Sequence, residues 1–322
     1  MDFTAPIPHP IADAFGVRDQ VVIVTGAAGH IGPRIATVFA ENGAHVLASD
    51  RPGANFDQAM EQLRAAGDVL AAPADLTQPD ELRAVIALAE QRFGRLNSLI
   101  CCGAIGTSDP LDYEKDDNFD RMFHTNVRGN WQLARYATAL LEKSGGGSIV
   151  NISSVNGHRA QFACSLYAGT KAALLAMTRE MSVELAPRLI RINSVSPGSI
   201  PAGERHAHHM ADRLHEPYRQ QFLEMATPLL ADAGRDYQPL PIAGKGEDIA
   251  MACVYLCSHA ARFVTGTDLL VDGAMLQNFD WHGARRRDRS SAWQKNREWL
   301  LALPEAAWKG ERPHWLQRPA RT

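Results

Sequence analysis

Three residues near the middle of the chain have the types and spacing of an acid–base site. Tyr167 and Lys171 are four residues apart, so on a helix they lie on one face. The ordinary pKa of a tyrosine is about 10, and a neighbouring ammonium favours the phenolate and lowers that pKa. Ser154 precedes Tyr167 by 13 residues, at the end of an apolar run where a hydroxyl could face a carbonyl oxygen. The three residues together predict proton transfer at a carbonyl or alcohol oxygen.

Because many helices carry Tyr-x-x-x-Lys by chance as a solvated pair, the elements around it must decide its meaning. Apolar runs alternate with amphipathic helical patterns up to about residue 275, and runs that are apolar throughout indicate a parallel sheet covered on both faces. We therefore predict an α/β fold, a doubly wound parallel sheet (Rossmann fold), in one domain at 1–276. The predicted strands are Val21–Thr25, His45–Asp50, Asp68–Pro73, Ser98–Cys102, Ser148–Ser153, Arg191–Ser196 and Asp268–Val271.

A small-residue loop follows the first predicted strand, in "VVIVTGAAGHIGPRIATVFA". Gly26, Gly29 and Gly32 could simply make a tight turn, or they could let backbone N–H groups and a helix N-terminus approach a pyrophosphate. Asp50 follows Gly26 by 24 residues, where a carboxylate accepts from ribose hydroxyls and repels a 2′-phosphate. The sequence thus favours NAD over NADP, although Arg51 could attract that phosphate.

Composition and charge exclude several classes of function. The 322 residues carry a net charge of −3 with 21% charged residues, which gives no reason to expect nucleic acid or membrane partners. The beginning of the chain lacks the basic start and apolar segment of an export signal. The five cysteines are odd in number and do not have the pattern of a disulfide-linked protein, so we expect a reducing, cytoplasmic location. The adjacent Cys101 and Cys102 could form a redox switch or be buried thiols.

Two segments depart from the alternation of strands and helices. Residues 199–246 are too long for an ordinary connection, and we expect a lid or binding loop there. Residues 277–322 hold ten Lys and Arg against five Asp and Glu, together with five of the six tryptophans. This C-terminal extension could be a disordered basic arm or could bind nucleic acid. We favour packing on its own or a neighbouring subunit, because "SSAWQKNREWLLALP" reads as a short helix that ends before Pro304.

The motifs together resemble the short-chain dehydrogenase/reductase family over about residues 15–276. "TGAAGHIG" (Thr25–Gly32) matches the TGxxxGxG cofactor loop at every defined position, and Asn126 in "NVRG" stands at the asparagine of the catalytic tetrad. Ser154, Tyr167 and Lys171 match the remaining three in type and spacing. "SPGSI" is similar to the loop that meets the nicotinamide, and "FVTGTDLLVDG" to the closing strand of the family.

The resemblance implies hydride transfer between C4 of a nicotinamide and a carbonyl or alcohol carbon. Tyr167 would transfer the proton, and Ser154 would hold the substrate oxygen. Lys171 would lower the Tyr167 pKa and hold the nicotinamide ribose, and Asn126 would bind a water that links Lys171 to solvent. Asp75 falls where the family contacts adenine. The implied cofactor-binding residues are Gly26, Gly29, His30, Ile31, Gly32, Asp50, Arg51, Asp75, Leu76, Cys102, Gly103, Tyr167, Lys171, Pro197, Gly198 and Ile200.

Two departures from the family pattern are visible. The fourth strand ends in Cys101-Cys102-Gly103-Ala104 where the family usually has Asn-Asn-Ala-Gly, so we expect altered packing rather than lost activity. Ala202 replaces a threonine that often binds the carboxamide, and Ser199 could substitute for it.

The substrate is less well specified than the reaction. Polar residues near the expected pocket mouth and in the lid suit a small sugar, polyol or hydroxy acid, unless they face solvent; they are Asn156, His158, Gln161, Arg205 and His206. Glu204, His206, His208 and His209 include metal-ligand types, but their spacing matches no zinc signature and we expect no metal.

Three functions remain open on the sequence. The leading one is an NAD-dependent alcohol dehydrogenase or ketone reductase that acts on a small molecule. The others are an NAD-using epimerase or dehydratase and a non-catalytic NAD-binding regulator, which would have no need of the acid–base residues. By resemblance, we expect a homodimer or homotetramer formed through long helices such as the one around Asn118–Leu141.

Overall fold

The computed structural model describes residues 10–107, 109–161, 163–201, 207–208, 211–232, 238–277 and 298–313. The chain divides into two compact units. The first comprises Met1–Thr107, Lys115–Pro197 and Gly246–Val271, and the second comprises Ser108–Glu114, Gly198–Lys245 and Asp272–Thr322. The predicted lid and the C-terminal extension therefore fall almost entirely in the second unit.

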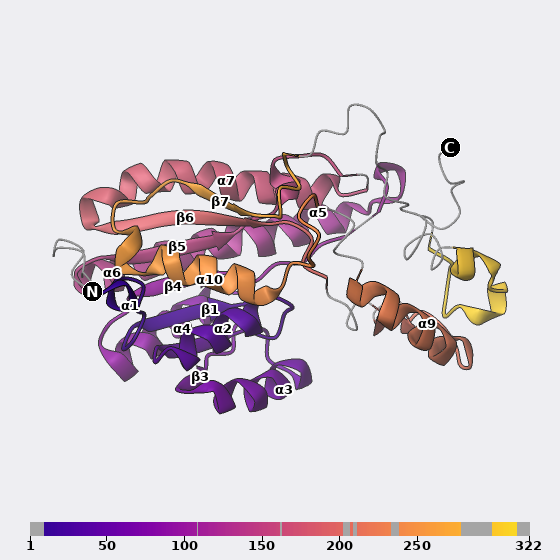
Figure 1. Cartoon of the computed structure of the whole chain (residues 1–322), viewed down its shortest axis with the longest axis horizontal. Coiled ribbons are helices and arrows are strands. Elements are labelled where there is room, and N and C mark those ends of the chain that lie inside the picture. The colour runs from indigo at the N-terminus through magenta and orange to yellow at the C-terminus, as the bar shows by residue number, and fades with distance from the viewer. Residues whose placement is uncertain are drawn as a thin grey trace. The chain divides into compact units, whose positions relative to one another are not determined.

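The first unit is built on a seven-stranded parallel sheet of order β3-β2-β1-β4-β5-β6-β7 (Figure 1). All seven predicted strands are confirmed, with ends that differ by at most two residues. Residues of β1 and β4–β6 are buried throughout because helices cover both faces of the sheet. The strands are β1 Val21–Thr25, β2 His45–Ser49, β3 Val69–Ala71, β4 Ser98–Cys101, β5 Gly147–Ile152, β6 Ile190–Pro197 and β7 Asp268–Val271.

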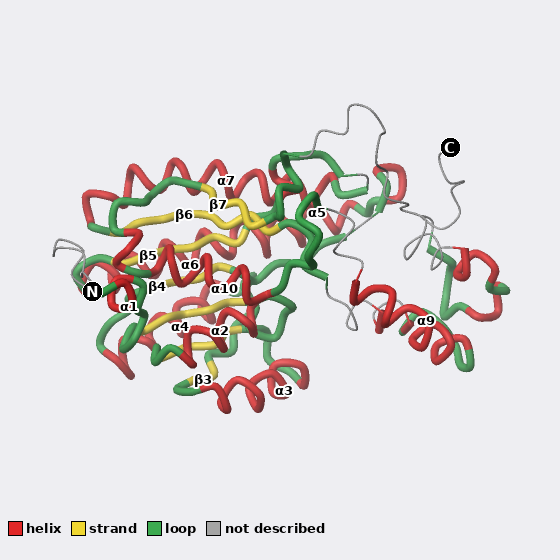
Figure 2. Tube along the Cα trace, in the orientation of Figure 1, coloured by secondary structure: helices red, strands yellow, loops and turns green. Residues whose placement is uncertain are grey.

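Helices flank the sheet in two layers, drawn in red around the yellow strands in Figure 2. Helix α2 packs against α10 on one face, and α4, α6 and α7 pack against the strands on the other. The helices of this unit are α1 Ile11–Ala14, α2 Gly32–Glu41, α3 Ala54–Leu63, α4 Pro79–Phe93, α5 Asp116–Met122, α6 Asn130–Lys143, α7 Ser165–Leu185 and α10 Gly246–Cys257. A π-helical segment, Phe123–Gly129, joins α5 to α6.

A large apolar core fills the space between the sheet and the second layer of helices. Alternate residues of a strand point to opposite faces, so Val21 and Ile23 of β1 enter this core together. Leu82, Val85 and Ile86 of α4 enter it from the helical side, at the spacing of one helix face. This core fixes the carboxyl ends of the strands, where ligands bind in open α/β sheets.

The second unit has a small core of its own. Helix α9 (Tyr218–Asp232) contributes Phe222 and Ala226, and the segment 298–313 contributes Leu300 and Trp308. A β-bridge pairs Leu214 with Trp308. Part of the C-terminal extension thus packs on the predicted lid of the same chain. The described ranges contain no helix that is long and apolar enough to span a bilayer.

Candidate active site

The predicted phosphate loop lies at the carboxyl end of β1, against the chain that leaves β4. Gly26 has a φ of +72°, in the left-handed region that favours glycine. A Cβ on Gly26 would lie 2.9 Å from Cα of Gly103, and one on Gly32 would clash with the carbonyl oxygen of Gly26. Only glycines allow this close packing of backbone, which is the geometry needed for a phosphate to approach main-chain N–H groups.

Two features beside the loop fit a dinucleotide. Helix α2 begins at Gly32, directly after the loop, and no side chain caps its N-terminus in the described chain, so the positive end of the helix dipole lies beside the loop. The Asp50 carboxylate accepts from the N–H of Ala28 at 2.8 Å and from the N–H of Arg51 at 2.8 Å. These bonds hold Asp50 beside the loop, and a carboxylate has further lone pairs for ribose hydroxyls.

The predicted ribose acid and the predicted catalytic lysine both act on Cys102 through their charges. Burial raises the pKa of its thiol to about 12, the charge of Lys171 lowers it and that of Asp50 raises it. Both charges therefore act on one thiol at the end of β4. Cys101 is buried and its pKa is also raised to about 12, mainly by burial. These pKa directions favour unreactive thiols over a redox switch.

Asp75 stabilises the turn that precedes α4. Its Oδ1 accepts from both the N–H and the hydroxyl of Thr77 at 2.8 Å, and its own N–H donates to Glu81 at 2.7 Å. One carboxylate oxygen is thus used within the chain, and Oδ2 is the atom that could meet adenine. Leu76 beside it is buried, and its Cδ1 would lie 2.7 Å from a Cβ on Gly103.

Asn126 lies in the π-helical segment Phe123–Gly129, a kind of irregularity often found at functional sites. It is fully buried, and its side chain exchanges two hydrogen bonds of 2.8 Å with the backbone of Ile105. Its Nδ2 also donates to Thr170 Oγ1 at 3.1 Å. Asn126 therefore joins the chain after β4 to helix α7.

Helix α7 brings Tyr167 and Lys171 together, as predicted from their spacing. The Lys171 Nζ lies 5.5 Å from the centre of the Tyr167 ring and donates to the carbonyl of Ile152 at 2.7 Å. Ser154 follows β5, and its side chain is close enough to Tyr167 to lower the pKa of the phenol. Ser153 locks the two elements together, because its hydroxyl donates to the Lys171 carbonyl at 2.9 Å.

Burial dominates the electrostatics of this cluster. It raises the pKa of Tyr167 to about 12, against the hydrogen bond from Ser154, which lowers it. It lowers the pKa of Lys171 to about 8, because a buried ammonium is poorly solvated.

We expected Lys171 to lower the Tyr167 pKa, and for the chain alone this expectation is wrong. Ser154, and not Lys171, is the group that lowers it. Nζ faces the ring and is already bonded to Ile152.

The structure describes three of the five predicted substrate residues, and their surroundings differ. Asn156 is partly buried beside Ser154, whose Oγ accepts from its N–H at 3.1 Å, and Gln161 is exposed. The ring of His158 contacts Asp268. Arg205 and His206 lie outside the described residues, as do Ala202, Glu204 and His209 of the other interpretations.

The predicted nicotinamide loop crosses the boundary of the two units. Pro197 ends β6 in the first unit. In the second unit, Gly198 lies close to the backbone of Asp272: a Cβ added to Gly198 would be 2.7 Å from the Cα of Asp272. Ile200 packs beside Gly244 in that unit. His30 and Ile31 lie in the glycine loop, and Ile31 stands at the N-cap of α2.

Three positioning residues were missed from the sequence. The hydroxyl of Thr25 accepts from the N–H groups of Cys102 and Gly103 at 3.0 Å each, which fixes the turn after β4. Thr170 connects Asn126 to α7, and Asn130 Nδ2 donates to Gly103 at 3.2 Å. Thr25 and Thr170 lie inside the quoted motifs, but a motif does not show which hydroxyl faces which backbone.

Comparison with known proteins agrees with this geometry. The family model described as enoyl-(acyl carrier protein) reductase matches residues 26–275. An uncharacterized oxidoreductase of Mycobacterium tuberculosis (strain CDC 1551 / Oshkosh) is 36% identical over 270 residues, which cover 82% of this chain and 95% of that protein. A short-chain type dehydrogenase/reductase from Mycobacterium marinum superposes with a TM-score of 0.69 at 28% identity, over 82% of this chain and 98% of its own.

The chain belongs to the short-chain dehydrogenase/reductase family. Another solved member is a 7α-hydroxysteroid dehydrogenase complexed with NADH and 7-oxo glycochenodeoxycholic acid. It superposes with a TM-score of 0.69 at 28% identity, over 81% of this chain and 96% of its own. Like these relatives, the chain is therefore a member of an oxidoreductase family.

A glycine substitution tests the phosphate loop. We expect Gly32→Ala to weaken NADH binding by at least about tenfold and to lower the free energy of unfolding by about 2 kcal/mol, because the new methyl clashes with the Gly26 carbonyl. Fluorescence titration with NADH and urea unfolding measure the two effects. Gly94→Ala is the control: φ is +67° but the space is open, so it strains the backbone without changing NADH affinity. Equal NADH affinity of Gly32→Ala and wild type would refute the loop assignment.

Proposed function

We propose that this chain is an NAD-dependent oxidoreductase that interconverts a secondary alcohol and a ketone, with Tyr167 as the general acid/base. The observation that carries the proposal is the cluster at the carboxyl ends of β4 and β5. There the Lys171 Nζ lies 5.5 Å from the Tyr167 ring centre, and the Ser154 side chain is close enough to lower the Tyr167 pKa. Acid–base residues in this order, beside a dinucleotide loop, suit proton transfer at the oxygen of a carbonyl or alcohol.

Each member of the cluster has a role in the proposal. Tyr167 donates its proton to the substrate oxygen in reduction, and a phenol with a pKa of about 12 holds that proton at neutral pH. Ser154 donates a hydrogen bond to the same oxygen. Lys171 holds the nicotinamide ribose, and Asn126 seats a water that connects Lys171 to solvent. When bound, the nicotinamide supplies or accepts the hydride.

The proposed cofactor is NAD, with NADP less favoured. Asp50 supports NAD because its carboxylate is held beside the glycine loop by the N–H groups of Ala28 and Arg51. A negative charge there repels a 2′-phosphate. Arg51 is exposed and could offset part of that repulsion. The remaining contacts are proposed from the loop and the strand ends; they are His30, Ile31, Leu76, Cys102, Gly103, Pro197, Gly198 and Ile200.

The proposed substrate is a small polar molecule such as a sugar, polyol or hydroxy acid. Asn156 and Gln161 support this choice as polar groups in the segment between Ser154 and Tyr167, and Arg205 and His206 are the proposed lid contacts. The structural relative complexed with 7-oxo glycochenodeoxycholic acid binds a different class of substrate, a bile acid, and a bile acid therefore serves as the contrasting substrate in the test.

The test is an NADH absorbance assay with the purified full chain and a panel of substrates. The panel holds sugars, polyols, hydroxy acids, simple secondary alcohols and a bile acid, each with NAD and with NADP. We expect turnover on a small polar alcohol, with higher activity on NAD than on NADP. Asp50→Asn should reduce the ratio of the activity with NAD to the activity with NADP. Turnover on the bile acid alone would overturn the substrate proposal.

Product analysis separates the competing reactions. If a substrate is converted to its epimer or to a dehydrated product without release of NADH, the chain is an NAD-using epimerase or dehydratase and not a net dehydrogenase. Tight NADH binding with no chemistry on any substrate would favour a non-catalytic regulator. An absence of nucleotide binding would overturn the cofactor assignment itself.

We also propose a homodimer or homotetramer in the cytoplasm. The large apolar side chains of Phe119 on α5 and Trp131 on α6 are 49% and 38% exposed, which supports burial by a second copy. The five cysteines, all of which lie in the described residues, form no disulfide, which supports a reducing compartment. Light scattering would decide the number of subunits.

A further inference from the structure

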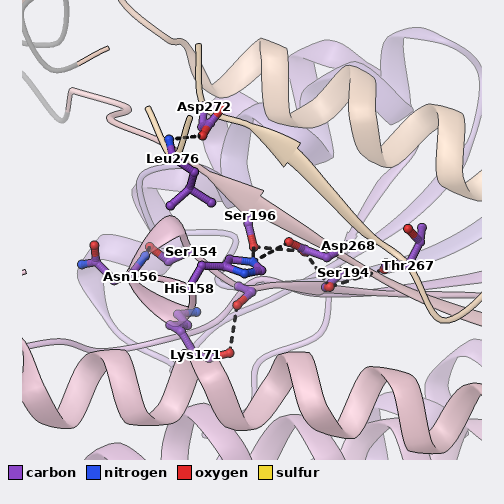
Figure 3. A network of polar contacts seen from close by, with 11 residues as sticks. Ser154, Asn156, His158, Lys171, Ser194, Ser196, Thr267, Asp268, Asp272 and Leu276 are labelled. Carbon is purple, nitrogen blue, oxygen red and sulfur yellow. Dashed lines mark hydrogen bonds and ion pairs between the residues drawn. The ribbon is translucent and has the colours of Figure 1, made fainter. Parts of the chain in front are cut away.

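A polar network ties the segment after Ser154 to the edge of the sheet (Figure 3). The Nε2 of His158 lies 2.7 Å from Oδ2 of Asp268, the first residue of β7. A carboxylate can only accept hydrogen bonds, so Nε2 carries the proton and donates it. The two residues are 110 positions apart in the sequence.

Two serines on β6 complete the environment of this carboxylate. Oδ1 of Asp268 accepts from Ser194 Oγ at 2.7 Å and from Ser196 Oγ at 3.0 Å. Three donors from two elements thus converge on Asp268, whose side chain is 17% exposed, while that of His158 is 34% exposed. Charge-assisted bonds in such a partly buried place hold a side chain more firmly than an exposed ion pair.

The other end of the segment is Ser154 itself. The residues 154–158 form a tight 3-10 turn, in which the N–H groups of Asn156 and Gly157 donate to Oγ and O of Ser154 at 3.1 and 2.9 Å. The N–H of His158 donates to Val155 O at 3.0 Å and closes the turn. Backbone hydrogen bonds of this turn therefore connect His158 to the Ser154 hydroxyl.

The two ends of the turn are held by different elements. Before it, Ser153 N–H donates to Val195 of β6 at 2.8 Å, and its hydroxyl donates to Lys171 of α7. Within it, Gly157 lies so close to α7 that a Cβ would be 3.0 Å from the backbone of Lys171. After it, the His158 ring reaches Asp268 on β7.

We propose that His158 is a positioning residue, which, held by Asp268, fixes the turn so that the Ser154 hydroxyl faces Tyr167. This inference rests on the proposed function, in which Ser154 orients the substrate oxygen. It also changes the interpretation of His158 from a substrate contact to a support of Ser154, because the proton-bearing Nε2 is committed to Asp268.

The kinetic test compares His158→Ala and Asp268→Asn with wild type on the substrate that the panel identifies. We expect kcat to fall about tenfold, since small displacements of a catalytic group reduce rate steeply, with KM changed by less than about twofold. In Asp268→Asn an amide N–H₂ replaces the acceptor that faces Nε2–H. His158→Gln keeps a donor at the end of the side chain, so we expect it to recover most of the lost kcat.

A double variant shows whether the effect passes through Ser154. In a Ser154→Ala background, His158→Ala should lower kcat by less than about a further twofold, because the hydroxyl that it positions is gone. A full tenfold loss in both backgrounds would mean general damage to the fold and would overturn the proposal. A rise in KM at constant kcat would restore the substrate-contact interpretation.

A second measurement does not depend on activity. Hydrogen exchange of the amides in 154–158 should become at least about tenfold faster in His158→Ala and Asp268→Asn. His45→Ala is the matched control, since His45 forms the same kind of pair with Asp68, Nδ1 to Oδ2 at 2.6 Å, away from the site. It should change neither exchange in 154–158 nor kcat. If no substrate is turned over, the exchange result still tests the tether, and unchanged exchange would refute it.

Discussion

Replacement of Tyr167 by Phe should lower kcat about 1000-fold in both directions of the proposed reaction, within the range that positioned acid–base groups supply. The substitution removes the phenol oxygen that transfers the proton and leaves the ring that packs beneath Lys171 Nζ, 5.5 Å from its centre. Ser154 would still donate to the substrate oxygen, but a serine hydroxyl is a poor proton source. The measurement is steady-state turnover on the best substrate of the panel, with NADH affinity determined by fluorescence.

The matched control is Tyr136→Phe on α6. Tyr136 lies under the Arg83 guanidinium, 4.8 Å from its ring centre, and has no part in the cluster. It should keep at least about half of the wild-type kcat. If Tyr167→Phe retains more than about a tenth of the activity while NADH affinity is unchanged, another group transfers the proton and the assignment of Tyr167 is wrong.

The fold was predictable because its signals are local. Most strands are largely apolar runs of four to eight residues with a turn signal at the end, such as Ser98–Cys101 before Gly103 or Gly147–Ile152 before Ser154. The pairing of Tyr167 with Lys171 was also predictable, since a four-residue spacing on a helix fixes their common face.

What the sequence could not show depends on burial and on distant contacts. The pKa of Tyr167 follows from desolvation, and a sequence spacing contains no measure of burial. The bond from His158 to Asp268 joins two polar residues 110 positions apart, which have no periodic pattern. The presence of Trp308 and Phe222 in one core cluster likewise depends on how the chain returns to the lid segment.

A second large effect concerns stability, and it separates the role of Lys171 in catalysis from its effect on folding. We expect Lys171→Met to abolish turnover and yet to raise the free energy of unfolding of the nucleotide-free protein by about 2 kcal/mol at pH 7. Burial lowers the pKa of Lys171 from 10.5 to about 8, so its charged form destabilises the native state by about 3 kcal/mol at 1.36 kcal/mol per pKa unit. Loss of the bond to Ile152 O offsets about 1 kcal/mol of the gain.

The pH dependence of this effect has a definite sign. Below pH 8 the lysine is charged in both the native and the unfolded wild type, so the burial penalty is present in full. Between pH 8 and 10.5 the native state loses its proton first while the unfolded chain keeps it, so wild-type stability from this group rises with pH. The advantage of Lys171→Met should therefore shrink as the pH approaches 10.5.

Urea unfolding at pH 7 and pH 10, without nucleotide, measures both the size and the pH dependence of this effect. Lys143→Met is the control, because Lys143 is 61% exposed in its pair with Glu90, and an exposed pair contributes at most about 1 kcal/mol. A Lys171→Met protein that is less stable than wild type at pH 7 would show that the ammonium is stabilised in the native state. A gain that is equal at both pH values would have to come from packing, since a desolvated charge loses its penalty once it is neutral. Only a gain that falls with pH identifies Lys171 as a residue whose buried charge destabilises the fold while serving the proposed chemistry.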